Sequence, residues 1–342
     1  MLRGKRVLYF TILAVLAAAV LILAIGIGSV AVHPARVLRI FYDLAAGSPD
    51  GAGDTAYTIF WQIRFPRVLL GFLIGASLAA AGAAFQGLLQ NPLADPYTIG
   101  VSSGAALGAT AAILLLPAGI FSSQLLIPVF GFIGALVALF CVYQLGRVGG
   151  RLPVVTVLLA GVVISSFFSA TISLGMLFAG EQMRNVFFWL VGGLSMRGWP
   201  YVGLTLPYLI LGLAVLIFFS RDLNLILLGE EEALSLGVEV ERVKKIVLVA
   251  ASLLTAGAVS VSGMIGFVGL IVPHAMRIIF GPDHRHLFPA AVLGGGVFLV
   301  AADTFARTVL SPVELPVGII TAFVGAPFFM YLLRRHRGKY RF

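Results

Sequence analysis

Residues 152–180 read LPVVTVLLAGVVISSFFSATISLGMLFAG and contain no Lys, Arg, Asp or Glu. A helix needs about 20 apolar residues to cross the hydrocarbon core of a bilayer, so this stretch is long enough to span a membrane. Similar charge-free runs recur along the chain, at residues 7–35, 68–94, 96–146, 198–220, 246–276, 286–302 and 315–333. The sequence therefore predicts a bundle of membrane helices.

The composition also excludes a soluble domain. Hydrophobic residues make up 60% of the chain, charged residues only 11%, and the mean hydropathy is +1.06. The net charge of +9 does not indicate a nucleic-acid surface, because the basic residues cluster at the ends of apolar runs, where they set membrane topology. The run at 7–35 is too long for the apolar core of a signal peptide, which is about 7–15 residues, and we interpret it as the first transmembrane helix.

Two of the runs decide how many spans there are. Residues 96–146 are too long for one helix and break near 117–124 into two. Residues 246–276 are too long for one helix and too short for two, and Ser260–Gly266 interrupts them. A short span after this interruption would extend to Gly281. The total is nine or ten.

The charge at the two ends favours ten spans. Both termini are strongly basic, and cytosolic loops carry the excess of Lys and Arg. Two cytosolic ends require an even number of spans, and this topology places 16 of the 23 basic residues in the cytosol. We therefore predict an all-α, polytopic membrane bundle of ten helices, forming one domain over residues 1–342 with both termini cytosolic. The segments predicted outside are 36–60, 117–124, 180–199, a turn near 260–265, and 304–316; those predicted inside are 91–97, 146–153, 221–245 and 277–286.

The longest charged stretch is Arg221–Lys245. It holds four basic and six acidic residues, so it is net negative where cytosolic loops are usually positive. Its leucines alternate with glutamates, and Gly229 and Gly237 divide it into short helices. The apolar face of such helices can dock into a groove of another protein. The alternatives are a loop folded back on its own bundle, or a membrane-surface helix, which would normally be rich in Lys and Arg.

Several arginines lie on the predicted outer side, among them Arg64 and Arg67 at the start of the second span. Outward arginines can form bidentate pairs with the carboxylates of a partner, or they can snorkel toward lipid phosphates. Asp303 and Arg307 are four residues apart near the outer end of the ninth span, a spacing that pairs acid with base on a helix. That pair is either a functional site or a structural pair that positions Arg307.

Small residues mark two further helix faces. Ser165, Ser169 and Ser173 recur every four residues in the fifth span, which fits either inter-helix packing or the wall of a pore. Glycines with the same spacing, Gly71 with Gly75 and Gly100 with Gly104, predict close packing of the second and third spans.

The sequence contains no set of residues for catalysis. Gly100–Gly104 matches the hydrolase nucleophile pattern, but it opens a membrane helix instead of following a strand. Walker motifs, zincin motifs and paired intramembrane carboxylates are absent. Three classes of protein remain: a subunit of an ATP-driven importer, an ion-coupled secondary transporter, and an intramembrane enzyme. The second would usually show acidic residues at mid-membrane, and the third needs a nucleophile or metal set.

Short motifs run in order along the chain: Pro66-Arg-Val-Leu-Leu-Gly71, Gln86-Gly-Leu-Leu-Gln-Asn-Pro-Leu-Ala-Asp-Pro96, Leu158-Leu-Ala-Gly161, Trp189-Leu-Val-Gly-Gly193, Leu234-Ser-Leu-Gly237, Gly263-Met-Ile-Gly-Phe-Val-Gly-Leu-Ile-Val-Pro-His274 and Glu314-Leu-Pro-Val-Gly-Ile319. Over residues 60–335 the chain thereby resembles the permeases of binding-protein-dependent iron-chelate, haem and cobalamin importers, the large type II ABC importers.

The resemblance implies an assembly in a bacterial or archaeal cytoplasmic membrane. Two permease subunits of ten helices each, forming a homodimer or a heterodimer, would surround a central path. Two cytosolic ATPase subunits would carry ATP and Mg, and one extracytoplasmic binding protein would deliver the cargo. The permease itself would hold no cofactor or metal and would bind no nucleic acid. An iron chelate such as a ferric siderophore is the expected cargo, with cobalamin or haem as alternatives.

The resemblance also implies roles for particular residues. Arg64, Arg67 and Arg307 match positions that receive acidic residues of the binding protein. Residues implied in coupling to the ATPase are Leu228, Gly229, Glu230, Glu231, Glu232, Ala233, Leu234, Leu236 and Gly237. Residues implied in the translocation path or its gate are Val154, Val155, Thr156, Ser165, Ser169 and Ser173.

Overall fold

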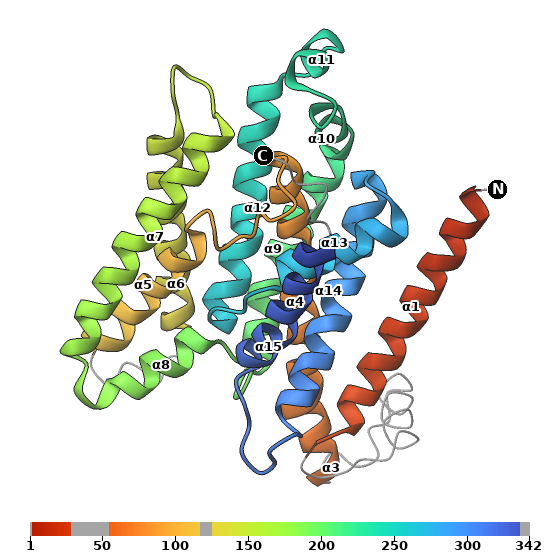
Figure 1. The fold of residues 1–342 in the computed structure, drawn as a ribbon. Coiled ribbons are helices and arrows are strands. Elements are labelled where there is room, and N and C mark those ends of the chain that lie inside the picture. Colours follow the sequence, from red (N-terminus) through yellow and green to blue (C-terminus); the bar gives the residue numbers. More distant parts are fainter. Residues whose placement is uncertain (1, 29–54, 117–124, 336–342) are drawn as a thin grey trace.

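The computed structural model describes residues 2–28, 55–116 and 125–335. Across these three ranges the chain is helical and forms no β-sheet; an isolated bridge pairs Val148 with Arg151. Seven of the helices are long and apolar enough to cross a membrane, and three shorter apolar helices lie among them (Figure 1). The predicted all-α membrane architecture is confirmed.

The helices follow the charge-free runs. The long spans are α1 (Leu2–Gly26), the continuous pair of the π-helix η1 (Ile59–Arg64) and α4 (Phe65–Leu88), α6 (Leu126–Gly146), α7 (Val154–Leu177), α9 (Trp199–Phe218), α12 (Val240–Ser262) and α14 (His284–Ala306). The shorter apolar helices are α5 (Val101–Leu115), α13 (Val268–Phe280) and α15 (Val317–Arg335). The remaining helices are α3 (Thr55–Thr58), η3 (Gly180–Gln182), α8 (Met183–Val191), α10 (Ser220–Ile226) and α11 (Glu230–Ser235).

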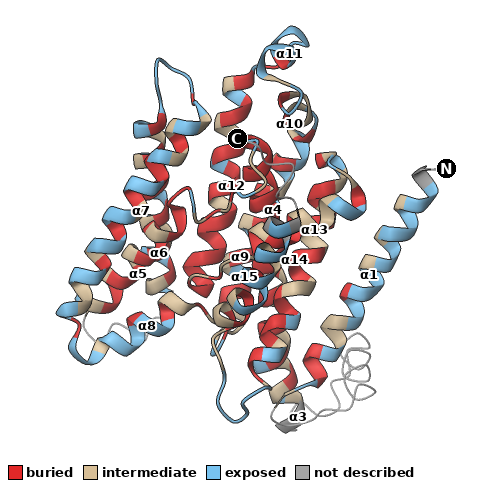
Figure 2. Ribbon diagram, viewed as in Figure 1, coloured by how far each residue is buried: buried red, intermediate tan, exposed pale blue. Residues whose placement is uncertain are grey.

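The second span lies at the centre of the bundle. In its most apolar window 89% of the residues are buried, against 22% in α1 at the edge (Figure 2). Small side chains allow its neighbours to come this close. A Cβ atom on Gly75 would lie 2.2 Å from the carbonyl oxygen of Gly295, and one on Gly82 would lie 1.8 Å from that of Gly269. Close helix packing at these glycines, predicted for Gly75, is confirmed.

Both long charge-free runs divide as predicted. The run at 246–276 breaks after Ser262, where Gly263 adopts a φ of 73°, and α13 then continues to Phe280. The run at 96–146 divides into α5 and α6; the predicted break at 117–124 lies outside the described residues. Because α5 begins only at Val101, after Gly100 with a φ of 85°, this span is shorter than expected.

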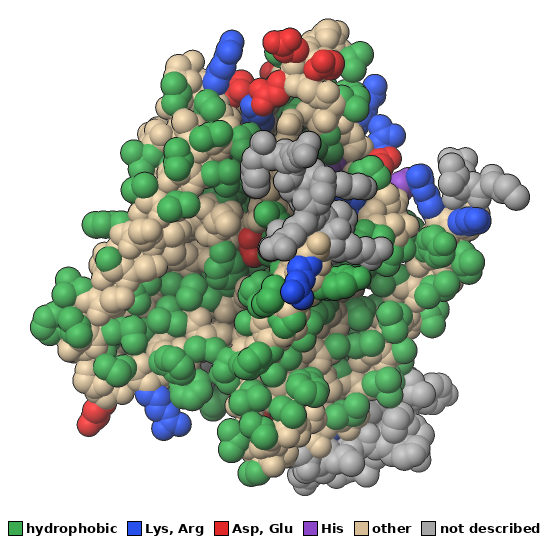
Figure 3. Space-filling model, viewed as in Figure 1, with side chains coloured by type: hydrophobic (Ala, Val, Ile, Leu, Met, Phe, Trp, Pro, Cys, Tyr) green, Lys and Arg blue, Asp and Glu red, His purple; other side chains and the backbone are tan. Residues whose placement is uncertain are grey.

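The polar connections gather at opposite ends of the bundle. Helices α10 and α11, the link between α6 and α7, and the start of α1 lie at the upper end in Figure 1, whereas α3, α8 and the link between α14 and α15 lie at the lower end. Acidic side chains cluster over α11, and on this face hydrophobic side chains are spread widely between the two ends, where few charged side chains are visible (Figure 3). These two polar ends are the candidate functional regions.

Candidate functional sites at the two ends of the bundle

The upper end is formed by the polar segment between α9 and α12. Gly229 has a φ of 140° and Gly237 a φ of 84°, backbone conformations that favour glycine. They separate α10 from α11 and α11 from α12, which confirms the predicted division into short helices. The last residues of the predicted segment belong to α12, because that helix already begins at Val240.

Helix α11 and the residues that flank it present an unusual face for a polar end. Leu228, Leu234 and Leu236 are 70%, 59% and 63% exposed, and we call these three residues the leucine tip. On the opposite side Ala233 and Val238 are buried and hold the segment against the bundle. Exposed leucines gathered among acidic residues are typical of a surface that another protein covers.

The three glutamates that open α11 differ in their contacts. The carboxylate of Glu230 contacts the ammonium group of Lys244, which is 4% exposed and lies 3.4 Å from Glu241. Glu231 and Glu232 are exposed and form no ion pair with any residue in the described ranges. Glu230 therefore fixes α11 to α12, and the other two glutamates are available to a partner.

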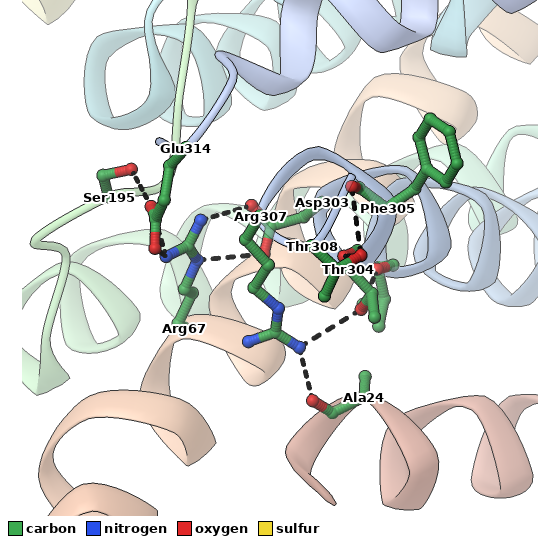
Figure 4. A network of polar contacts seen from close by, with 10 residues as sticks. Ala24, Arg67, Ser195, Asp303, Thr304, Phe305, Arg307, Thr308 and Glu314 are labelled. Atoms are coloured by element: carbon green, nitrogen blue, oxygen red, sulfur yellow. Dashed lines mark hydrogen bonds and ion pairs between the residues drawn. The ribbon is translucent and has the colours of Figure 1, made fainter. Parts of the chain in front are cut away.

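At the lower end one arginine holds two carboxylates. The guanidinium of Arg67 donates from Nε to Asp303 Oδ2 and from Nη2 to Asp303 Oδ1, both at 2.9 Å. Its Nη1 donates to Glu314 at 3.1 Å (Oε1) and 2.9 Å (Oε2), and the hydroxyl of Ser195 donates to Glu314 Oε2 at 2.7 Å (Figure 4). This network joins α4, α14 and two connecting segments.

The other two predicted docking arginines bind the end of the first helix. Arg64 donates to the carbonyls of Ile25 at 3.1 Å and Gly26 at 3.2 Å, and Arg307 donates to the carbonyl of Ala24. The last carbonyls of a helix have no partner within the helix, and positive charge there is favourable. These contacts attach α1 to the bundle.

The structure corrects the predicted pair of Asp303 and Arg307. Asp303 bonds to Arg67 instead, because the guanidinium of Arg67 meets its carboxylate through two parallel hydrogen bonds. Arg307 directly follows the last residue of α14. Its Nη2 donates to the hydroxyl of Thr304 at 3.2 Å and to the carbonyl of Ala24 at the end of α1. The four-residue spacing alone did not reveal a stronger partner on another helix.

The three docking arginines are not displayed to solvent. Arg64, Arg67 and Arg307 are 5%, 8% and 7% exposed. Their predicted contact with a binding protein stays a prediction, and it requires a rearrangement of the groups that now cover them.

A cavity of about 710 Å³ adjoins this network. Its wall includes Arg184 on α8, Ser195 and Arg197 in the following segment, and Glu314. Arg184 lies over the ring of Phe188 at 5.6 Å, and Arg197 lies over the ring of Tyr201 at 4.7 Å. Neither arginine forms an ion pair with a described residue, so the cavity wall carries two positive charges that no carboxylate of the described chain neutralises.

Helix α7 carries the residues predicted for the path. Ser165 lies 3.3 Å from Ser103 of α5, whereas Ser169 and Ser173 are exposed. Thr156 donates to the carbonyl of Gly146 at 2.6 Å, and Val154 is partly buried. The serine stripe thus divides: its first residue packs against α5, and the next two lie on the open side of the helix.

That open side is broad and mostly apolar. Val155, Leu159, Val163 and Phe167 are 66%, 60%, 60% and 65% exposed. A surface of this kind fits lipid or a second membrane subunit, and both interpretations of the serine stripe, packing and pore lining, stay open.

Sequence reasoning missed three residues of these sites. Glu314 and Ser195 were not singled out as partners of Arg67, and Lys244 was not recognised as a buried cation. Glu314 did offer a signal, because it is a lone acid at the start of an apolar run. Partial burial on its own would raise the pKa of Glu314. The hydrogen bond from Ser195 and the charge of Arg67 lower it by more, so the pKa lies below its ordinary value.

Comparisons with known proteins place this geometry in context. The FecCD transport family matches residues 15–335. The cobalamin import system permease protein BtuC of Halobacterium salinarum is 48% identical over 301 residues, covering 88% of this chain and 79% of the relative. The Fe(3+) dicitrate transport system permease protein FecD of Escherichia coli is 38% identical over 286 residues, covering 84% and 88%. A solved structure described as an inward-facing ABC transporter of the metal-chelate type is similar with a TM-score of 0.82 at 30% identity, covering 94% of this chain and 97% of that one.

Proposed function

This chain belongs to the FecCD transport family, and from that premise we propose that it forms half of the membrane path by which a bacterium or archaeon takes up an iron chelate. It is the permease subunit of an ABC importer, and the ATPase activity of such importers lies in a separate subunit. In this proposal the chain is one transmembrane domain without a cofactor, and ATP and Mg bind to the partner ATPase.

The proposed topology has ten spans and cytosolic termini. Seven long and three shorter apolar helices supply the required number among the described residues. Helix α1 begins at the same end of the bundle as α10 and α11 (Figure 1). The excess of basic residues at both termini supports placing that end in the cytosol.

The observation that carries the proposal is the leucine tip beside Glu231 and Glu232. Three exposed leucines at a polar end of the bundle are costly to leave in water, and a groove on a cytosolic ATPase would cover them. The ion pair between Glu230 and Lys244 attaches α11 firmly to α12, so α12 moves when α11 is displaced. In this proposal Gly229 and Gly237 set the angle at which the tip meets the ATPase.

A second permease subunit would cover the open side of α7. We propose a homodimer in which Ser169 and Ser173 face the central path, because small hydroxylated walls bind a polar cargo only weakly and do not trap it. Val154, Val155 and Thr156 lie at the cytosolic start of the same helix and would form the gate, which an apolar constriction closes by excluding water.

Transport would proceed by alternating access. The loaded binding protein docks at the outer end near Arg64, Arg67 and Arg307, and ATP binding brings the two ATPases together beneath the permeases. The assembly needs only two packings that differ by a few kcal/mol, with nucleotide and binding protein shifting the balance. The permease performs no covalent chemistry in this cycle.

The proposed cargo is an iron chelate, which agrees with the iron-dicitrate relative and with the metal-chelate transporter. Cobalamin is the second candidate, because the cobalamin permease shares 48% identity with this chain. Haem is a further alternative that uses similar machinery.

The test is uptake into proteoliposomes that contain the permease with its co-purified ATPase and binding protein. Ferric citrate, haem and cyanocobalamin are compared, with ATP or a non-hydrolysable analogue on the ATPase side. ATP-dependent uptake of a ferric chelate supports the proposal, and preferential uptake of cyanocobalamin shifts it to the second candidate. Uptake by the permease alone, driven by an ion gradient without ATP, would overturn the proposal.

A further inference from the structure

The two carboxylates on Arg67 differ in how firmly they are held. The side chain of Asp303 is 4% exposed and lies on α14, whereas that of Glu314 is 40% exposed. Glu314 belongs to the segment that connects α14 to α15, and α15 begins at Val317. Breaking a half-exposed ion pair on a connecting segment costs much less than breaking a buried pair, which leaves an uncompensated charge out of water. Glu314 is therefore the carboxylate that can leave Arg67.

The space beside Glu314 has the right charge for another carboxylate. Glu314 and Ser195 line the cavity of about 710 Å³, together with Arg184 and Arg197. The guanidinium carbons of the two arginines lie over aromatic rings at 5.6 Å and 4.7 Å, and neither arginine has a carboxylate partner among the described residues. Their N–H groups can therefore bind an incoming acid. An acidic group that enters the cavity thus meets two arginines in the wall and reaches Glu314 at the network.

We propose that an acidic side chain of the extracytoplasmic binding protein enters this cavity and replaces Glu314 on Arg67. The inference rests on the proposed function, because it requires a binding protein that docks at this end. Arg67 holds two carboxylates before the exchange and two after it, so no buried charge is left unpaired. The released carboxylate of Glu314 moves toward Arg184 and Arg197.

The exchange gives docking a route into the membrane helices. Glu314 holds Ser195 at 2.7 Å, so its release frees the segment between α8 and α9. The backbone N–H of Gly318, at the start of α15, meets the carbonyl of Gly192 at 3.4 Å, and that of Gly193 meets Ser262 at the end of α12 at 2.8 Å. A shift of Glu314 therefore acts on the ends of α8, α12 and α15.

The first test measures the affinity of the binding protein for the complete complex in lipid nanodiscs. Glu314→Gln keeps the size of the side chain and removes its charge, and Glu181→Gln, an exposed glutamate at the same end, is the matched control. The exchange predicts that Glu314→Gln tightens binding about five- to thirtyfold, because the partner no longer competes with an internal carboxylate. The control should change affinity less than twofold.

If the binding protein binds the Glu314→Gln complex more weakly or equally well, the exchange is wrong. That result is expected if Glu314 only holds the docking surface in shape. If the binding protein does not bind the unaltered complex at all, the proposed function itself fails. The two failures are therefore distinguishable.

The second test needs no binding protein. In a Cys141→Ala background, Met196→Cys places a thiol at a residue that lines the cavity and is 97% exposed. We compare its rates of reaction with a sulfonate-bearing and a trimethylammonium-bearing methanethiosulfonate reagent, each divided by the rate of the same reagent with a small free thiol. If the cavity attracts acids, the sulfonate reagent should react faster than the cationic one, by about threefold or more. The ratio of the sulfonate rate to the cationic rate should be still larger in Glu314→Gln.

Replacing Arg184 and Arg197 by Gln should bring the ratio toward one, whereas Glu181→Gln should leave it nearly unchanged. A ratio that favours the cationic reagent, or that stays the same when both arginines are replaced, would contradict the proposed cavity.

Discussion

Lys244 on α12 is buried, and its ammonium group contacts the carboxylate of Glu230 on α11. Glu241, at 3.4 Å from the same ammonium, also accepts the backbone N–H of Leu152 at 2.9 Å. This contact joins the polar segment to α12, and it extends through Leu152 to the residues just before α7. The polar segment proposed to receive force is thus linked through Lys244 and Glu241 to Leu152, two residues before the helix proposed to line the path.

Removing Glu230 should weaken this connection. Glu230→Gln leaves the buried ammonium with only Glu241, so we expect the free energy of unfolding to fall by about 1–3 kcal/mol. Denaturant unfolding of the purified permease in detergent measures the change. Glu232→Gln, an exposed glutamate of the same helix, should change it by less than about 0.5 kcal/mol. Equal effects of the two substitutions would contradict the tether.

The leucine tip should govern association with the ATPase and leave folding intact. Leu234→Asp places a charge where we propose an apolar contact, and Glu231→Lys reverses a free charge beside it. Either change should reduce co-purification of the ATPase at least tenfold, without lowering the thermal stability of the permease alone. Glu239→Lys, an exposed glutamate beyond Gly237, is the matched control. Full retention of the ATPase in Leu234→Asp would exclude the tip as the contact.

The packing around α4 predicts a strong effect at one glycine. A Cβ on Gly82 would collide with the backbone of Gly269, whereas one on Gly203 in α9 meets nothing within 4 Å. Gly82→Ala should cost at least about 1–3 kcal/mol of stability, visible as a lower melting temperature and a lower yield. Gly203→Ala should be neutral or slightly stabilising. Comparable yields and melting temperatures for both variants would contradict the close approach.

The ion pair of Glu314 predicts a defined pH dependence. Its pKa lies below the ordinary value of 4.5, so the contribution of its charge to stability is complete above that pH and is lost as the pH falls through the lower, folded-state pKa. The difference in melting temperature between the unaltered permease and Glu314→Gln should therefore be constant from about pH 7 to about pH 5 and should shrink below about pH 4.5. A difference that grows on acidification would have the wrong sign.

Much of the fold follows from the sequence because the position of a membrane helix depends mainly on residues that are neighbours in the chain. A charge-free run of sufficient length becomes a span, and Gly263, Gly229 and Gly237 end helices where their backbone takes a positive φ. The start of α5 at Val101 was less predictable, since the residues before it are as uncharged as the helix.

The sites were harder to predict because their partners are far apart in the chain. Arg67 and Asp303 are separated by 236 positions and Arg67 and Glu314 by 247, so no local spacing could pair them. Local spacing instead paired Asp303 with Arg307, which the structure corrects. The three leucines of the leucine tip could be assigned to an amphipathic segment, but their exposure depends on how Ala233 packs against the bundle.

The central claim is that a separate ATPase binds the leucine tip and drives the permease. The most direct measurement places a photo-crosslinking amino acid at Leu234 in membranes of cells that express the whole system, with Ile210 on the exposed side of α9 as the control position. The account predicts that residue 234 crosslinks to a nucleotide-binding ATPase and that residue 210 does not. Crosslinks from residue 234 only to lipid or to the permease itself would contradict it.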